Sequence, residues 1–245
     1  MVNWRIDDFM KKKGLIIAID GPAAVGKSTM GKLIARELGF RYIDTGAIYR
    51  AITWKVLKNN IDKNDENMIS DLVLNICITI ENANNNSLKD YYHIFVDGEN
   101  VTEKIRNPKI DQHVSQIARL PKIRKHLIQL QRKLAEKGNI VMEGRDIGSV
   151  ILPEADIKLY FTASEEERIM RRYKELIDKG YNVDRKEVKK QIIQRDEIDS
   201  KRKYAPLIKA KDAIVIDSTD KSIEETKHEI LRIIKKHSDC KGKEN

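Results

Sequence analysis

The chain has 245 residues, of which 40% are hydrophobic and 35% charged, and it carries a formal net charge of +9. This composition is typical of a helix-rich globular protein and excludes the disordered and fibrous classes. The positive charge favours anionic partners, namely nucleotides, nucleic acids or acidic membranes, but does not choose among them.

The first half of the chain predicts strands and helices in alternation. The apolar run at residues 15–20, LIIAID, predicts a short buried strand that ends before Gly-Pro. Apolar spacing from Lys27 to Leu38 predicts a helix. FRYID, at residues 40–44, predicts a second strand, and the segment from 47 to 60 predicts a second helix.

The segment from about 76 to 105 differs from this pattern. It predicts two or three short strands around an Asn-rich turn and a VDGEN turn, and we expect a small antiparallel insertion rather than a separate domain. Residues 107–138 then predict two helices, the second of which begins at Pro121.

The alternation resumes in the second half. Strands are predicted at residues 139–144, 156–163 and 213–219, and helices at 164–180 and 222–236. Ser164 is the expected N-cap of the first of these helices, with Glu167 completing a capping box. Strands that alternate with helices indicate an α/β protein with a parallel sheet covered on both faces.

Residues 21–29, GPAAVGKST, join the first strand to the first helix and fit the pattern G-x-x-x-x-G-K-[ST]. The glycines let backbone N–H groups surround one anion, and the helix that follows adds its positive end. We expect Lys27 to reach the β- and γ-phosphates and the Ser28 hydroxyl to ligate Mg²⁺. A chance match in a Gly/Ala turn is the alternative, but the strand–turn–helix context is the one that the mechanism requires. The predicted ATP-binding residues are Gly21, Pro22, Ala23, Ala24, Val25, Gly26, Lys27, Ser28 and Thr29.

Arginines near the expected ends of strands and helices indicate what happens to the phosphate. A motor or a GTPase would need a carboxylate that orders a water molecule, and we find no apolar strand ending in Asp-Glu. Arginine binds phosphate through two nitrogens at once, so these residues favour phosphoryl transfer between two nucleotides. A solvated surface position remains the alternative for any single arginine. The set comprises Arg50, Arg124, Arg145, Arg168, Arg171, Arg172, Arg195 and Arg202.

Four segments in order resemble the bacterial cytidylate kinase family. They are IDGPAAVGKST, YIDTGAIYRA, EGRDIGSVILPEAD and RDEIDSKRKYAPLIKAKDAIVIDST. The resemblance implies a P-loop fold of three layers, with a five-stranded parallel sheet, helices on both faces, a small antiparallel insertion at about 76–105 and a helical lid at about 164–185. It implies a kinase domain over residues 14–237, between an N-terminal extension (1–13) and a tail (238–245).

The family's activity is transfer of the γ-phosphoryl group of ATP to CMP, and to dCMP, with Mg²⁺. By position, the catalytic residues are expected to be Lys27, Arg145, Arg168 and Arg171. The expected CMP-binding residues are Thr45, Arg50, Ser115, Arg124, Arg145, Asp146, Arg195, Asp199 and Arg202. Glu143 and Ser149 depart from the residues usual in the family, and neither is a predicted ligand.

The expected role of Asp146 rests on the chemistry of the base. A carboxylate accepts a hydrogen bond from the N4 amino group of cytosine, whereas uracil presents an acceptor, O4, at that position. Within the family, Arg124 and Ser115 match the residues that meet the cytosine edge, and Arg195 and Asp199 those that meet the ribose. A plain ion pair is the alternative for each carboxylate, Asp146 with Arg145 and Asp199 with Arg195.

Two other functions stay open from the sequence. A P-loop kinase of another acceptor, such as UMP or shikimate, would share most of these motifs. A basic, nucleotide-regulated nucleic-acid-binding protein would suit the charge, but aromatic residues make up only 6% of the chain. We expect no nucleic-acid or membrane partner and a monomer. Two cysteines, no apolar stretch near ~18 residues and no secretory signal lead us to expect a cytoplasmic protein.

Overall fold

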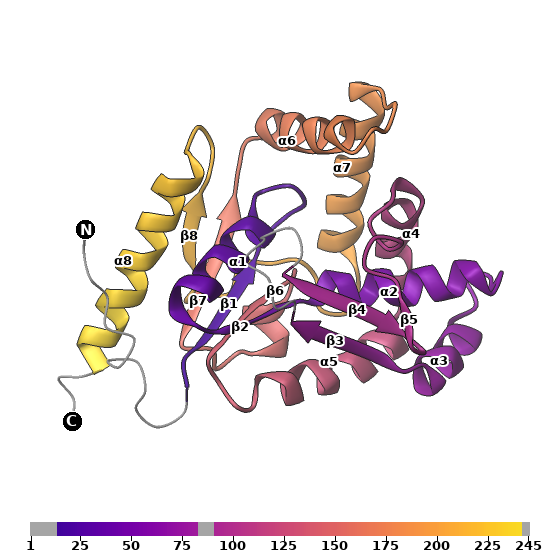
Figure 1. Ribbon diagram of the computed structural model, residues 1–245, viewed down its shortest axis with the longest axis horizontal. Coiled ribbons are helices and arrows are strands. Elements are labelled where there is room, and N and C mark those ends of the chain that lie inside the picture. Colours follow the sequence, from indigo (N-terminus) through magenta and orange to yellow (C-terminus); the bar gives the residue numbers. More distant parts are fainter. Residues whose placement is uncertain (1–13, 83–90, 242–245) are drawn as a thin grey trace.

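The computed structural model of the protein describes residues 14–82 and 91–241. Its main sheet has five parallel strands in the order β2-β6-β1-β7-β8 (Figure 1). The predicted fold class is therefore confirmed. These strands are β1 (Ile16–Asp20), β2 (Arg41–Asp44), β6 (Ile140–Glu143), β7 (Ile157–Thr162) and β8 (Ile214–Asp217).

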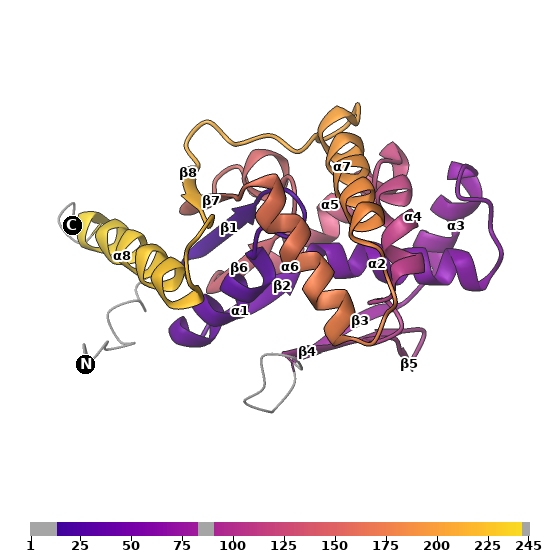
Figure 2. The same ribbon diagram turned by 90° about the horizontal axis from the view of Figure 1, so that it is seen from above.

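Helices cover both faces of this sheet because its central strands are apolar on both sides. Ile17 and Ile19 of β1 pack in one cluster with residues of α1 and α8, whereas Ala18 packs on the other face with residues of α5. Such two-sided burial explains why β1 is an uninterrupted apolar run in the sequence. Figure 2 shows α1 and α8 on the side of the sheet away from α5. These three helices are α1 (Lys27–Leu38), α5 (Pro121–Ala135) and α8 (Ile223–Lys241).

The predicted insertion is an antiparallel sheet of β3 (Ile78–Asn82), β4 (Tyr92–Val96) and β5 (Glu99–Asn100). A turn with positive φ at Asp97 and Gly98 joins β4 to β5, as the VDGEN motif predicts. Residues of β4 share the main hydrophobic cluster with residues of α2 (Thr45–Lys58), so this sheet is built onto the same core. Residues 83–90 of the predicted Asn-rich turn lie outside the described residues.

The remaining helices form the right-hand side and the top of Figure 1. Helices α3 (Glu66–Asn75) and α4 (Pro108–Ala118) pack with α2 and α5 around a second hydrophobic cluster. Helices α6 (Glu165–Asp178) and α7 (Arg185–Lys201) pack on each other through a cluster of their own. The pair α6–α7 therefore rests on the rest of the protein through few apolar contacts, as a lid would.

Several elements differ from the sequence prediction. Helices α3 and α7 (Arg185–Lys201) were not predicted, and neither was the π-helical turn η2 (Ile147–Ile151) that follows β6. Helix α8 continues to Lys241, so it includes the first residues of the segment expected to be a frayed tail. Ser164 does cap α6, but the Glu167 carboxylate pairs with Arg171 instead of completing a capping box.

Candidate active site

The loop between β1 and α1 has the backbone geometry of a phosphate-binding loop. Gly21 has a φ of +145°, and a β-carbon there would lie 2.4 Å from the carbonyl oxygen of Phe161. Gly26 is the N-cap of α1, with a φ of +89° and no side-chain cap. Since no side chain satisfies the first N–H groups of α1, they remain for an external anion.

Lys27 places a positive charge inside this loop. Its Nζ donates a hydrogen bond to the carbonyl oxygen of Pro22 at 2.6 Å. Burial, followed by the nearby charge of Arg145, holds the pKa of Lys27 well below its usual value. A buried cation whose pKa is lowered in this way is stabilised when an anion binds beside it.

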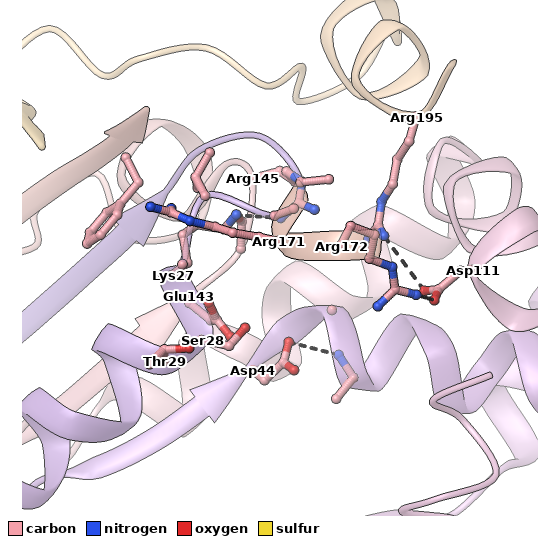
Figure 3. Close-up of a pocket in the computed structure, with 18 of the residues that line it drawn as sticks. Lys27, Ser28, Thr29, Asp44, Asp111, Glu143, Arg145, Arg171, Arg172 and Arg195 are labelled. Carbon is pink, nitrogen blue, oxygen red and sulfur yellow. Dashed lines mark hydrogen bonds and ion pairs between the residues drawn. The ribbon is translucent and has the colours of Figure 1, made fainter. Parts of the chain in front are cut away.

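A carboxylate that the sequence analysis set aside lies next to this loop. Glu143 ends β6, is 2% exposed and accepts a hydrogen bond from the hydroxyl of Tyr42 through Oε1. Among the described residues, Oε2 has no hydrogen-bond partner of ordinary geometry, and the side chain lies beside Ser28 (Figure 3). Burial and the charge of Asp44 raise the pKa of Glu143. Glu143, which the sequence analysis did not count among the ligands, therefore lies beside Ser28 at the point where β6 ends.

The predicted base-reading carboxylate is held by two arginines. Asp146 forms ion pairs with Arg124 and with Arg202, the latter at 3.0 Å, and all three side chains are almost fully buried. Arg124 also donates to the carbonyl oxygen of Ala118 at 3.1 Å. The alternative in which Asp146 pairs with its neighbour Arg145 is wrong, since no such contact is formed among the described residues.

Arg145 and Asp199 form a second pair, between Nε and Oδ2 at 3.0 Å. Asp199 also lies 3.8 Å from Arg202, and the alternative, an ion pair with Arg195, is not formed among the described residues. Arg195 is partly buried, and its Nε, which is shielded from solvent, has no hydrogen-bond partner among the described residues. Burial, then the charges of Arg145 and Arg50, lowers the pKa of Arg195 to about 10. The site therefore holds more positive charge than its own carboxylates balance.

The two arginines of the predicted lid lie in different environments. Arg168 donates to the carbonyl oxygen of Ala23 at 3.2 Å and pairs with Asp196, which in turn accepts from the backbone N–H of Ala23 at 3.0 Å. Arg171 donates to Ser218, through Nη1 to Oγ at 3.0 Å and through Nη2 to the carbonyl oxygen at 2.7 Å. Arg168 thus links α6 to the phosphate-binding loop, and its catalytic role stays a prediction.

One cavity of about 830 Å³ joins these parts. Of the residues predicted from the sequence, Gly21, Pro22 and Arg168 do not line it, and all the others do. Thr45 and Ser115, both buried, lie in its wall, and the Thr45 hydroxyl donates to the carbonyl oxygen of Glu143 at 2.8 Å. The sequence analysis missed Glu143, Asp44 and Asp111, three acidic residues that also line the cavity.

None of the described helices is both long enough and apolar enough to cross a membrane. Among solved structures, an uncharacterized protein from Eubacterium ventriosum ATCC 27560 matches with a TM-score of 0.50 and 13% identity, covering 92% of this chain and 99% of that one. At this identity the match concerns the fold alone.

Sequence comparison identifies the family. The family described as "Cytidylate kinase" matches residues 17–236. A cytidylate kinase of Clostridioides difficile (strain 630) is 45% identical over 217 residues, which cover 89% of this chain and 96% of that protein. A cytidylate kinase of Alkaliphilus metalliredigens (strain QYMF) is 49% identical over 217 residues, covering 89% of this chain and 94% of that protein. The chain therefore belongs to the cytidylate kinase family.

Proposed function

We propose that the protein transfers the γ-phosphoryl group of ATP to CMP, and to dCMP, giving the nucleoside diphosphate and ADP. The observation that carries this proposal is a single cavity that joins the phosphate-binding loop to a pocket lined by arginines. Membership of the cytidylate kinase family supports the choice of CMP as the acceptor.

Each part of the cavity has a task in this reaction. The loop at residues 21–29 binds the phosphates of ATP through backbone N–H groups, and Lys27 neutralises the charge that develops during transfer. Arg50 and Arg145 bind the acceptor phosphate. Arg195 shares the Asp111 oxygen Oδ1 with Arg50, so we assign it to the phosphate as well, in place of the ribose contact that the resemblance implies. Asp146, held by Arg124 and Arg202, accepts a hydrogen bond from the amino group of cytosine. Positioning and charge supply the catalysis, without a covalent intermediate on the protein.

Ser28 and Glu143 fit a Mg²⁺ ion bound together with ATP. A hydroxyl and a carboxylate are the oxygen ligands that Mg²⁺ takes, usually one or two from the protein with the rest from phosphates and water. The Glu143 carboxylate lies beside Ser28, which lowers its pKa through a hydrogen bond, so the two side chains are close enough to share one ion, which supports this assignment. When bound, Mg²⁺ supplies charge neutralisation on the transferring phosphate. The cytoplasmic setting and the monomeric state belong to the same proposal and stay predictions.

A panel of acceptors tests the proposal. Purified protein with ATP and Mg²⁺ is assayed for ADP formation with CMP, dCMP, UMP and AMP at equal concentrations. We expect the highest kcat/KM with CMP and dCMP. A preference for UMP would show that CMP is not the acceptor. Salt-dependent binding of nucleic acid without kinase activity would show that the protein is a nucleic-acid-binding protein and not a kinase.

A further inference from the structure

Three arginines from three helices meet at the carboxylate of Asp111, in the first turn of α4. Figure 3 shows two of them, Arg172 and Arg195, at this carboxylate. Arg50 of α2 lies with Nε 3.3 Å from Oδ1, and Arg195 of α7 lies with Nη1 3.7 Å from the same oxygen. Arg172 of the lid helix α6 forms an ion pair with Oδ2. One carboxylate therefore connects α2, α6 and α7.

The setting makes these contacts stronger than surface ion pairs. The Asp111 side chain is 13% exposed, and those of its three arginine partners are between 19% and 22% exposed, so water screens them little. Burial alone would raise the pKa of Asp111, but the charges of Arg50, Arg172 and Arg195 outweigh it and the pKa is lowered. The positive end of α4 adds to the preference for the ionised form.

Asp111 and its three partners all line the cavity. Two of those partners, Arg50 and Arg195, belong to the proposed acceptor-phosphate set, whereas Arg172 does not. Arg50 uses Nε toward Asp111, and its Nη1 has only a long ion pair with Asp44, at 4.0 Å. Neither terminal nitrogen makes a hydrogen bond among the described residues, so both can turn to a phosphate. Without Asp111, three partly buried guanidinium groups would repel one another, and each would gain freedom to turn away from the cavity.

We propose that Asp111 is a positioning residue for the acceptor phosphate: it holds Arg50 and Arg195 toward the cavity before the acceptor binds, and it ties the lid helix to α4 through Arg172. This inference rests on the proposed function, because it assigns the phosphate to these arginines. Asp111 itself does not contact the reacting atoms in this proposal.

The test is the kinetics of Asp111→Asn, which removes the charge at nearly constant shape. We expect the KM for CMP to rise about ten- to a hundredfold, because misplaced arginines lose charge-assisted hydrogen bonds to the acceptor phosphate. The kcat should change less than about threefold. Asp111→Glu, which keeps the charge, should recover part of the loss. The matched control is Glu175→Gln, which removes a carboxylate 2.6 Å from Arg172 but leaves Arg50 and Arg195 paired. It should keep the KM of the wild type.

The sign of the KM change decides the matter. A carboxylate near a phosphate repels it, so if Asp111 acted through charge alone, Asp111→Asn would lower KM and overturn the inference. An unchanged KM, or a loss confined to kcat, would overturn it as well. If Asp111→Asn does not fold, Arg172→Gln replaces it: a KM raised several-fold supports the inference, and an unchanged KM contradicts it. Should the acceptor panel select another monophosphate, the same comparison uses that acceptor, so the two proposals fail separately.

Discussion

The two halves of the cavity are built by different means. The half proposed for ATP is one continuous loop, residues 21–29, in which the backbone and two positive-φ glycines make the binding surface. The half proposed for CMP takes side chains from α2, α4, α5 and α7 and from the loop after β6, and pairs them as buried ions. The geometry of a site made by the backbone depends on the local conformation of one segment. The geometry of a site made by paired charges depends on every side chain in the pairs. Substitutions should therefore separate activity from stability in the first half and affect both in the second.

The largest effect on rate is expected from Lys27→Ala, in the backbone-built half. It should lower kcat about 10²- to 10³-fold, because the charge on Nζ stabilises the transferring phosphate. The free energy of unfolding should change by less than about 1 kcal/mol, since burial already disfavours the charged form. Steady-state kinetics and urea unfolding measure the two quantities. Turnover near that of the wild type would exclude the loop from the mechanism.

Asp146→Asn, in the half built from paired charges, should change both the stability and the activity. Loss of the anion between Arg124 and Arg202 should reduce the free energy of unfolding by about 3 kcal/mol. The side-chain amide can also meet O4 of uracil, so the selectivity between CMP and UMP should narrow by about 1–3 kcal/mol. The ratio of kcat/KM for the two acceptors measures this change. If both activities fall by the same factor, Asp146 holds its arginines in place without reading the base.

Arg171→Ala tests the prediction that α6 belongs to a lid. Arg171 lines the cavity and is held by Ser218, so its charge is available when the lid is closed. We expect kcat to fall about tenfold and the KM for CMP to change little. The unfolding midpoint serves as the control for folding. A loss confined to the KM for CMP would instead assign Arg171 to the acceptor half.

The smallest effect concerns Asp20, which connects the two halves. Its carboxylate accepts hydrogen bonds from the backbone N–H groups of Ile147 and Gly148, at 2.8 and 2.7 Å. Burial is the main cause of a pKa raised from 3.8 to about 6. A raised pKa adds stability that is complete below the unfolded value and is lost as the pH rises through about 6.

The free energy of unfolding of the wild type, relative to Asp20→Asn, should accordingly fall by about 1 kcal/mol between pH 5 and pH 7. Urea unfolding of both proteins at the two pH values measures this difference. A relative stability that is constant or increases over the range would show that Asp20 is ionised throughout.

Sequence reasoning recovers most of the fold and the contiguous half of the site. Every main strand was predicted, and the loop at residues 21–29 is recognisable because its glycines, its lysine and its flanking elements are adjacent in the chain. Glu143 and Asp111 were missed for a physical reason. A carboxylate at the end of a strand or in the first turn of a helix is common, and only the three-dimensional packing brings these two beside Ser28 and the three arginines. The irregular turn η2 carries no pattern of apolar spacing that would have predicted it.

The position of Asp196 beside Arg195 links the events at the two nucleotides. Within one turn of α7, Asp196 accepts from the backbone of the ATP loop and Arg195 enters the monophosphate pocket. A helix moves as a unit, so a displacement of α7 that favours one ligand changes the site of the other. The affinities for the two nucleotides are then thermodynamically coupled, and the coupling is reciprocal: ATP must alter the affinity for CMP by the same factor as CMP alters the affinity for ATP.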